Sequence, residues 1–258
     1  MRAPHSGVPM NSYQAPPDLL KDRVILVTGA GQGIGQAAAL SFAAHGATVI
    51  LLGRNEQRLN ATYDLIADAG HPEPVLFTLD LEQAGDRDFE QMADAIEGQL
   101  GRLDGILHNA SRLDALAPLA LETLEQWLGI LRVNLVAPFA LTRACLPLLK
   151  AAPDASVLMT SDTHGRKPTA YWGAFGVAKW ALEALVKTWA QELEITPQVR
   201  INALVPGPVQ SPQRRKTHPA ELPHTLPRPE AIMPAYLYLM GPDSRGVSGQ
   251  ILDAQGVT

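Results

Sequence analysis

The sequence predicts one α/β domain with a doubly wound parallel sheet and helices on both of its faces. Two observations predict this fold. Short, continuously apolar segments alternate along the chain with longer helical patterns, and those segments lack an alternation of apolar and polar residues. Continuously apolar strands are buried on both faces, as in parallel sheets covered by helices. The length of 258 residues suits one large domain of this class.

The predicted strands share a short run of aliphatic and β-branched residues bounded by polar residues, glycine or proline. In chain order they are expected at Arg23–Thr28, Thr48–Leu52, Pro74–Leu79, Gly105–His108, Ser156–Thr160, Val199–Val205 and Gln250–Asp253. Ligands of such sheets bind beyond the carboxyl ends of the strands, where the strand order reverses.

The predicted helices are the longer patterns between these strands. They are expected at Ile34–His45, Glu56–Ala69, Asp88–Leu100, Leu121–Lys150, Gly173–Glu194 and Ala231–Met240. Pro138 and Pro147 are expected to bend or break the fourth of these regions, because proline lacks a backbone N–H. The proline-rich segment Pro206–Pro229 is expected to be mostly loop.

The composition limits the environment and the partners of the domain. The net charge of -5 gives no indication of nucleic acid or of an anionic membrane. No uninterrupted apolar run reaches membrane-spanning length, so no membrane partner is expected. The single cysteine, Cys145, permits no intrachain disulfide and no cysteine metal cluster, and it favours a reducing, cytoplasmic setting. No metal site is expected.

Residues 1–18 are expected to form a disordered or loosely held arm that precedes a single domain at 19–258. The arm is rich in proline and small polar residues, and it lacks the continuous apolar stretch of a signal peptide.

The strongest functional signal is the turn Thr28–Gly35, which follows a predicted strand and opens a predicted helix. A glycine-rich turn in this context binds phosphate. Gly29 permits the tight turn, Gly33 lets the backbone approach a pyrophosphate, and Gly35 lets the helix pack closely on the strand. The helix N-terminus adds free N–H groups and a positive dipole end. The other residues of the turn expected to contact a dinucleotide are Gly31, Gln32 and Ile34.

The spacing Thr-Gly-x-x-x-Gly-x-Gly resembles that of the short-chain dehydrogenase/reductase family. Further motifs extend the resemblance over nearly the whole chain after the arm, and they are Asp80, Asn109-Ala110-Ser111, Asn134, Lys179 and Pro206-Gly207. The resemblance implies a Rossmann-like domain that binds a nicotinamide cofactor. It also implies a small-molecule carbonyl or alcohol substrate, converted by hydride transfer, and a homodimer or homotetramer formed through long apolar helices.

The end of the second strand favours NADP(H) over NAD(H). An NAD-preferring site places an acidic residue there to bind the ribose hydroxyls, whereas this chain has Gly53 followed by Arg54. Glycine removes the carboxylate that would repel a 2′-phosphate, and Arg54 can pair with that phosphate. The alternative is a solvated arginine at a helix start.

The resemblance implies three further cofactor contacts. Asp80 would accept from the adenine amino group, with a backbone contact from Leu81. Asn109 and Ala110 would line the ribose. The loop after the sixth strand would meet the nicotinamide carboxamide, and its contact residues are Pro206, Gly207 and Val209.

The resemblance also implies a catalytic tetrad of Asn, Ser, Tyr and Lys, of which this chain keeps two members. Asn134 and Lys179 match, and Lys179 would also hold the nicotinamide ribose. The Tyr position, four residues before the lysine, holds Phe175, and the Ser position, thirteen residues before that, holds Asp162. Phe175 has no proton to transfer, and loss of a general acid typically costs about 10²–10⁴-fold in rate.

Three interpretations of these replacements stay open. In the first, the chain binds NADP(H) as a sensor, scaffold or oligomer partner with little activity. In the second, Tyr171 replaces the lost tyrosine from the helical face that also carries Phe175 and Lys179, although it can equally be a pocket wall or an interface aromatic. In the third, an apolar pocket keeps Asp162 in its protonated form, and Asp162 acts as the general acid. His164 and Arg166 follow on the same loop, and either could act on a substrate, although a lone loop histidine is more often solvated.

Overall fold

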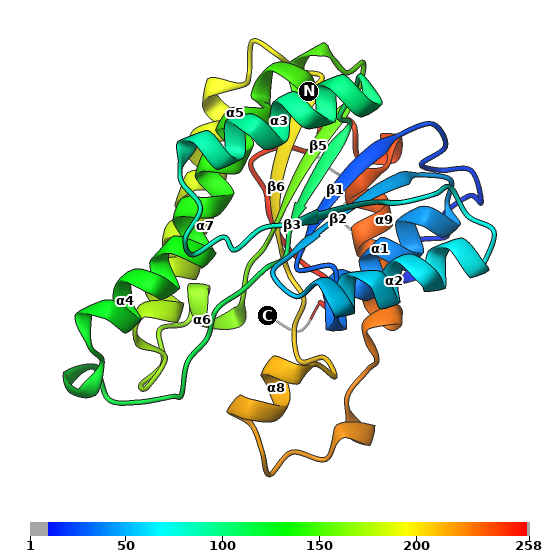
Figure 1. Cartoon of the computed structure of the whole chain (residues 1–258). Helices are drawn as coiled ribbons and strands as arrows, with labels where there is room; N and C mark the ends of the chain where they lie inside the picture. The colour runs from blue at the N-terminus through cyan, green and yellow to red at the C-terminus, as the bar shows by residue number, and fades with distance from the viewer. Residues whose placement is uncertain (1–9, 257–258) are drawn as a thin grey trace.

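Seven parallel strands form one sheet in the computed structural model, which describes residues 10–256 (Figure 1). They are β1 Val24–Thr28, β2 Thr48–Gly53, β3 Val75–Thr78, β4 Gly105–His108, β5 Ala155–Thr160, β6 Val199–Val205 and β7 Ile251–Asp253. Their order across the sheet is β3-β2-β1-β4-β5-β6-β7, and every neighbouring pair is parallel. The order reverses between β1 and β4, which confirms the predicted doubly wound sheet.

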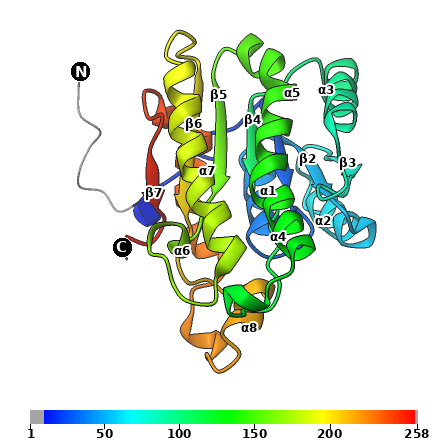
Figure 2. The same cartoon turned by 90° about the vertical axis from the view of Figure 1, so that its left-hand side faces the viewer.

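Helices cover both faces of this sheet. One face carries α3 Asp86–Leu100, α4 Leu124–Leu131, α5 Ala137–Ala151 and α7 Gly173–Glu192, and Figure 2 looks onto these helices. The other face carries α1 Gly33–Ala44, α2 Glu56–Asp68 and α9 Met233–Met240. Successive residues of β1 enter opposite cores, Leu26 toward α3 and α5 and Val27 toward α1 and α9, so the strand is buried on both sides.

Most predicted helix bounds agree with these to within two residues, but the region Leu121–Lys150 differs. Here α4 continues through a π-helical turn, Arg132–Val136, directly into α5, and the helix does not break. Pro138 lies in the first turn of α5 and Pro147 lies inside that helix. The irregularity is the π turn before Pro138, a feature often found at functional sites.

The run Leu124–Ala151 is long and apolar enough, by length and composition alone, to cross a membrane, and among the described residues it is the one helix that passes this test. Half of its most apolar window is buried inside the fold. This helix was not expected from the sequence to be long and apolar enough to cross a membrane, because polar and charged residues interrupt its apolar runs. Its burial against α3 and the sheet is that of a core helix.

Two short helices lie at the carboxyl ends of the strands. The first, α6 Thr163–Arg166, was not predicted; the second, α8 Pro212–Thr217, interrupts the segment predicted to be mostly loop. Ser211 caps α8 by accepting from the backbone N–H of Arg214. Figure 1 shows α8 below the sheet, across the end where the strands stop.

Part of the predicted N-terminal arm is held against the domain. Residues 1–9 of the arm lie outside the described residues. In the rest, Tyr13 packs edge-on against Tyr238 at 5.3 Å and donates a hydrogen bond to Asp243 at 2.7 Å. Over residues 10–18 the chain therefore packs on α9 and the turn that follows it, instead of being loosely held.

Candidate cofactor and active site

The turn after β1 is fixed to the end of β4 across the point where the strand order reverses. The Thr28 hydroxyl oxygen accepts from the backbone N–H groups of Asn109 and Ala110, both at 2.9 Å. Gly29 has a φ of 70°, and a Cβ at Gly35 would lie 2.2 Å from the Gly29 oxygen. The roles predicted for Gly29 and Gly35 in shaping this turn therefore have a direct steric basis.

One cavity at this edge of the sheet collects most of the residues predicted to bind a cofactor. Those that line it are Gly29, Gly31, Gln32, Gly33, Ile34, Arg54, Asp80, Leu81, Asn109, Ala110, Lys179 and Pro206. Gly35, Gly207 and Val209 do not line it: Gly35 packs under the Gly29 oxygen, Gly207 lies against the Gln255 side chain, and Val209 is buried. Asp162 and Phe175 line the same cavity, so it spans from the phosphate turn to the tetrad positions.

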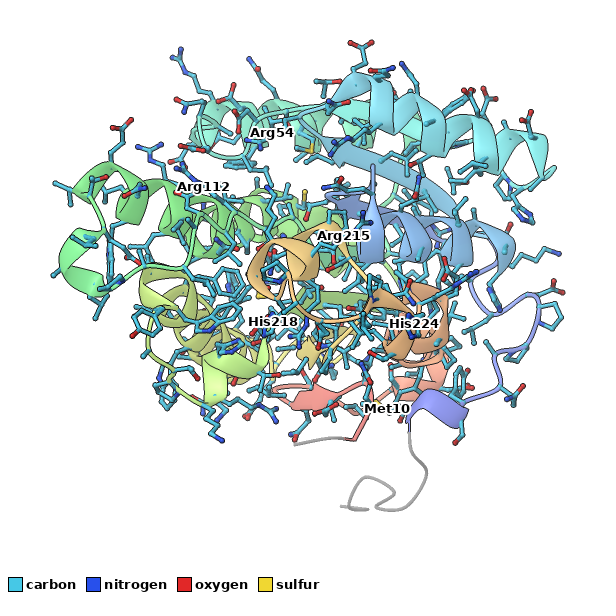
Figure 3. All side chains as sticks on the ribbon, turned by 90° about the horizontal axis from the view of Figure 1, so that it is seen from below. Met10, Arg54, Arg112, Arg215, His218 and His224 are labelled. Atoms are coloured by element: carbon cyan, nitrogen blue, oxygen red, sulfur yellow. The ribbon has the colours of Figure 1, made fainter. Side chains whose placement is uncertain are left out.

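Two guanidinium groups lie where β2 ends. Arg54 is exposed, and Arg58, in the first turn of α2, donates to the Gln32 side chain at 2.5 Å. A Cβ at Gly31 would lie 2.8 Å from the Cβ of Arg58, so the glycine makes room for α2. Figure 3, which looks onto this edge, places Arg54 and Arg112 on the opposite side of α8 from His218. The acidic residues that line the cavity are Asp80 and Asp162.

The Asn134 side chain lies in the π turn and has all its hydrogen-bonding groups occupied. It accepts from the Ser111 hydroxyl at 2.8 Å and donates to the backbone oxygens of Arg112 and Ile130 at 2.7 and 2.8 Å. It is 1% exposed. The side chain therefore fixes the segment after β4 against α4, and it does not line the cavity.

Lys179 is buried in α7 and points at the end of β5. Its Nζ donates to the backbone oxygen of Thr160 at 2.7 Å and lies 5.5 Å from the centre of the Phe175 ring. Burial lowers the pKa of Lys179 to about 8, although the charges of Asp162 and Glu183 oppose that shift. A lysine with such a pKa can carry or release a proton near neutral pH.

Asp162 caps the short helix α6 as a hydrogen-bond acceptor. One oxygen, Oδ1, accepts from the backbone N–H of His164 at 2.9 Å and lies 2.6 Å from Nδ1 of its ring. Burial would raise the pKa of Asp162, but the hydrogen bonds from His164 and the charge of Lys179 outweigh it and lower the pKa. These partners favour the charged form, which argues against the interpretation of Asp162 as a protonated acid.

Tyr171 lies outside the helix that carries the tetrad positions. α7 begins at Gly173, and Tyr171 has a φ of 74° and is 58% exposed. The prediction that one helical face carries Tyr171 together with Phe175 and Lys179 is wrong, because the backbone reverses before the helix starts. Trp172 turns inward instead, stacking on His164 with ring centres 3.5 Å apart.

Two residues of the site are positioned by contacts that the sequence alone does not reveal. The Gln255 side chain donates to the backbone oxygens of Pro206 and Pro208 at 2.8 and 2.9 Å and so fixes the loop after β6. His164 was expected to be solvated, yet its side chain is 17% exposed. A signal for either residue exists only in the folded chain, because the partner groups come together through the sheet topology or a backbone reversal.

Comparisons with known proteins agree on one family. The model of the short chain dehydrogenase family matches residues 23–222. The uncharacterized oxidoreductase YciK of Escherichia coli K12 is 42% identical over 94% of this chain and 96% of its own length. The short chain dehydrogenase of Shigella flexneri superposes with a TM-score of 0.93, at 40% identity and with 97% of each chain covered. A short chain dehydrogenase of Escherichia coli CFT073, solved in complex with NADPH, superposes with a TM-score of 0.90 at 42% identity. The superposition covers 93% of this chain and 99% of that protein. The chain belongs to the short-chain dehydrogenase/reductase family of oxidoreductases.

Proposed function

We propose that this chain is an NADP(H)-dependent oxidoreductase that reduces a small carbonyl compound or oxidises the matching alcohol. The observation that carries the proposal is the single cavity that connects the phosphate turn and Arg54 with Lys179, Phe175 and Asp162. When bound, the nicotinamide supplies or accepts the hydride. A short cavity confined to the turn would support nucleotide binding alone.

The end of the cavity formed by β1, α1 and β2 fits NADP(H). Gly33 has a φ of 58° and lines the cavity, so backbone N–H groups can approach a pyrophosphate. Gly53 and exposed Arg54 leave room and positive charge for a 2′-phosphate. Two family members of known structure, from Shigella flexneri and Escherichia coli, were solved in complex with NADP and NADPH, which supports the same choice here.

The retained tetrad residues can do part of the family chemistry. Lys179 can hold the ribose and accept or release a proton, while Asn134 keeps the segment after β4 in place. Phe175 has no exchangeable proton, and an ionised Asp162 accepts hydrogen bonds only. The proton that accompanies hydride transfer must therefore come from a group other than these two. Apolar neighbours of Phe175, including Trp172, Leu113 and Trp127, favour an apolar substrate.

A second candidate is an NADP(H)-binding protein without turnover, acting as a sensor, scaffold or oligomer partner. The observation that favours it is the buried Phe175 ring, 1% exposed, beside the charged Asp162. An anion at this position would repel the negative charge that develops on a carbonyl oxygen during reduction.

We expect the chain to form a homodimer or homotetramer in the cytoplasm. α5 and α7 carry large apolar side chains on the surface, Phe139 at 39% and Trp180 at 57% exposure, with Val136 and Val177 nearby on the same helical runs. Apolar surface of this kind marks protein interfaces. The lone cysteine, Cys145, is buried, which suits a reducing compartment.

Titrations with NADPH and NADH, followed by nicotinamide fluorescence, test the binding step. We expect NADPH to bind more tightly, and tighter binding of NADH would contradict the role given to Arg54. NADPH consumption across a panel of apolar aldehydes and ketones tests the chemistry. A chain that binds NADPH and reduces none of them fits the second candidate.

A further inference from the structure

Asp162, which lines the cavity, forms a carboxylate–imidazole pair with His164. The Asp162 Oδ1 atom lies 2.6 Å from Nδ1 of the imidazole and accepts from the backbone N–H of the same residue at 2.9 Å. The Trp172 ring also holds the imidazole by stacking on its face. The two ring planes are 12° apart and their centres lie 3.5 Å apart. The imidazole is therefore held in position and orientation by two neighbours.

This pairing determines which nitrogen of His164 is available for chemistry. A carboxylate oxygen accepts hydrogen bonds, so Nδ1 of His164 is the donor in this contact and carries a proton. Nε2, on the other side of the ring, has no hydrogen-bonding partner among the described residues.

The pair lies next to the position where the family has its proton donor. Asp162, Phe175 and Lys179 line one cavity, and the ring of Trp172, which stacks on His164, lies 5.7 Å from the ring of Phe175. The Trp172 ring thus adjoins both the imidazole of His164 and the Phe175 ring, which lines the cavity.

We propose that His164, oriented by Asp162, donates and accepts the proton in this active site. The inference rests on the oxidoreductase function proposed above. In reduction, the carbonyl carbon receives the hydride, and the electron pair of the broken C=O π bond takes the proton from Nε2 to form the hydroxyl group. The imidazole is left neutral and regains its proton from water. Alcohol oxidation reverses each step.

His218 on the loop after α8 is the competing donor. Its ring lies 6.2 Å from Trp172, and its Nδ1 lies 2.9 Å from the Thr217 hydroxyl, with no carboxylate in that contact. Burial and the charge of Arg214 lower the pKa of His218, which leaves it less protonated at neutral pH. Asp162, the N-cap of α6, contacts His164 directly, and the charges of both residues act on His218.

The test compares His164→Gln with His218→Gln in NADPH-dependent reduction of the carbonyl panel. His224→Gln, an exposed histidine of the same loop region, is the matched control. We expect His164→Gln to lower kcat by about 10²–10⁴-fold, the usual contribution of a general acid, while the NADPH dissociation constant stays unchanged. Added imidazole should restore part of the activity of His164→Ala, which a merely structural residue would not allow.

A proton NMR spectrum gives a readout that needs no turnover. The Nδ1 proton shared with Asp162 should resonate far downfield, disappear in His164→Gln and Asp162→Asn, and remain in His218→Gln. Its absence from the wild type would overturn the pairing on which the inference depends.

The outcomes separate the inference from the function beneath it. Wild-type turnover that survives His164→Gln overturns the inference alone, and selective loss in His218→Gln assigns the proton to His218 instead. A wild type that binds NADPH and reduces no carbonyl overturns the oxidoreductase function, and the inference falls with it.

Discussion

The two ends of the cavity are built from different kinds of atoms. At the end formed by β1, α1 and β2, the shape comes from the backbone and from positions that admit only hydrogen as a side chain, such as Gly29 and Gly35. At the end formed by β5 and α7, the chemistry depends on the side chains of Asp162, Phe175 and Lys179. Because the two ends use separate residues, one can keep the family pattern while the other departs from it.

That difference separates binding from proton transfer. The phosphate-binding end keeps the spacing of the family, so it retains the geometry needed for a dinucleotide. At the other end, Phe175 and Asp162 stand at the positions that the resemblance assigns to the tetrad tyrosine and serine, and the Asp162 carboxylate contacts the imidazole of His164. Substitutions at the two ends should therefore affect cofactor binding and proton transfer separately.

The largest expected effect belongs to Gly35→Ala at the phosphate-binding end. The added Cβ would lie 2.2 Å from the backbone oxygen of Gly29, so the turn must move. We expect the free energy of unfolding to fall by about 3 kcal/mol, the upper part of the range for overpacking, and NADPH binding to be lost.

Chemical denaturation and nicotinamide fluorescence measure both effects of Gly35→Ala. Gly98→Ala in α3 is the matched control, because a Cβ there meets nothing within 4 Å. Gly98→Ala should stabilise α3 by about 0.5–1 kcal/mol and leave NADPH binding unchanged. Equal behaviour of the two variants would contradict the close approach of α1 to the turn.

The next effect concerns the proton-transfer end. Phe175→Tyr combined with Asp162→Ser rebuilds the family tetrad beside Lys179, and it should give turnover that no longer depends on His164. In this background, His164→Gln should change kcat by less than about threefold, against about 10²-fold or more in the wild type. A kcat loss of the same size in both backgrounds would show that His164 supports the site without transferring the proton.

The sequence could predict the phosphate-binding end because its signals are local. The spacing of Thr28–Gly35 between a strand and a helix is visible without any contact partner, and the strands are marked by continuous apolar runs. The arrangement around His164 could not be predicted in this way. It depends on a reversed backbone at Tyr171, with a φ of 74° in a non-glycine residue, which turns Trp172 onto the imidazole. Similarly, Gln255 reaches Pro206 only through the pairing of β6 with β7.

A smaller effect is expected for Arg54→Ala, which changes cofactor preference and leaves the fold intact. Removal of one charge-assisted phosphate contact should weaken NADPH binding by about 10–100-fold and leave NADH binding nearly unchanged. Arg87→Ala, an exposed arginine of α3 away from the cavity, is the control. Equal weakening for both cofactors would indicate that Arg54 stacks on the adenine instead of pairing with the 2′-phosphate.

The smallest effect is the pH dependence of NADPH binding, which links the two ends through Lys179. Burial lowers the pKa of Lys179 to about 8 in the folded chain, so its ammonium group is charged below pH 8 and loses its charge as the pH rises through 8.

Because an ammonium holds ribose oxygens and nearby phosphates more strongly than an amine, the affinity of the wild type for NADPH should exceed that of Lys179→Met by about threefold to tenfold at pH 7. That ratio should shrink by pH 9, since both side chains are then uncharged, and fluorescence titrations at the two pH values measure it. A ratio that stays constant would mean that Lys179 contributes through packing against Phe175, and the charge at the proton-transfer end would then have no part in holding the cofactor.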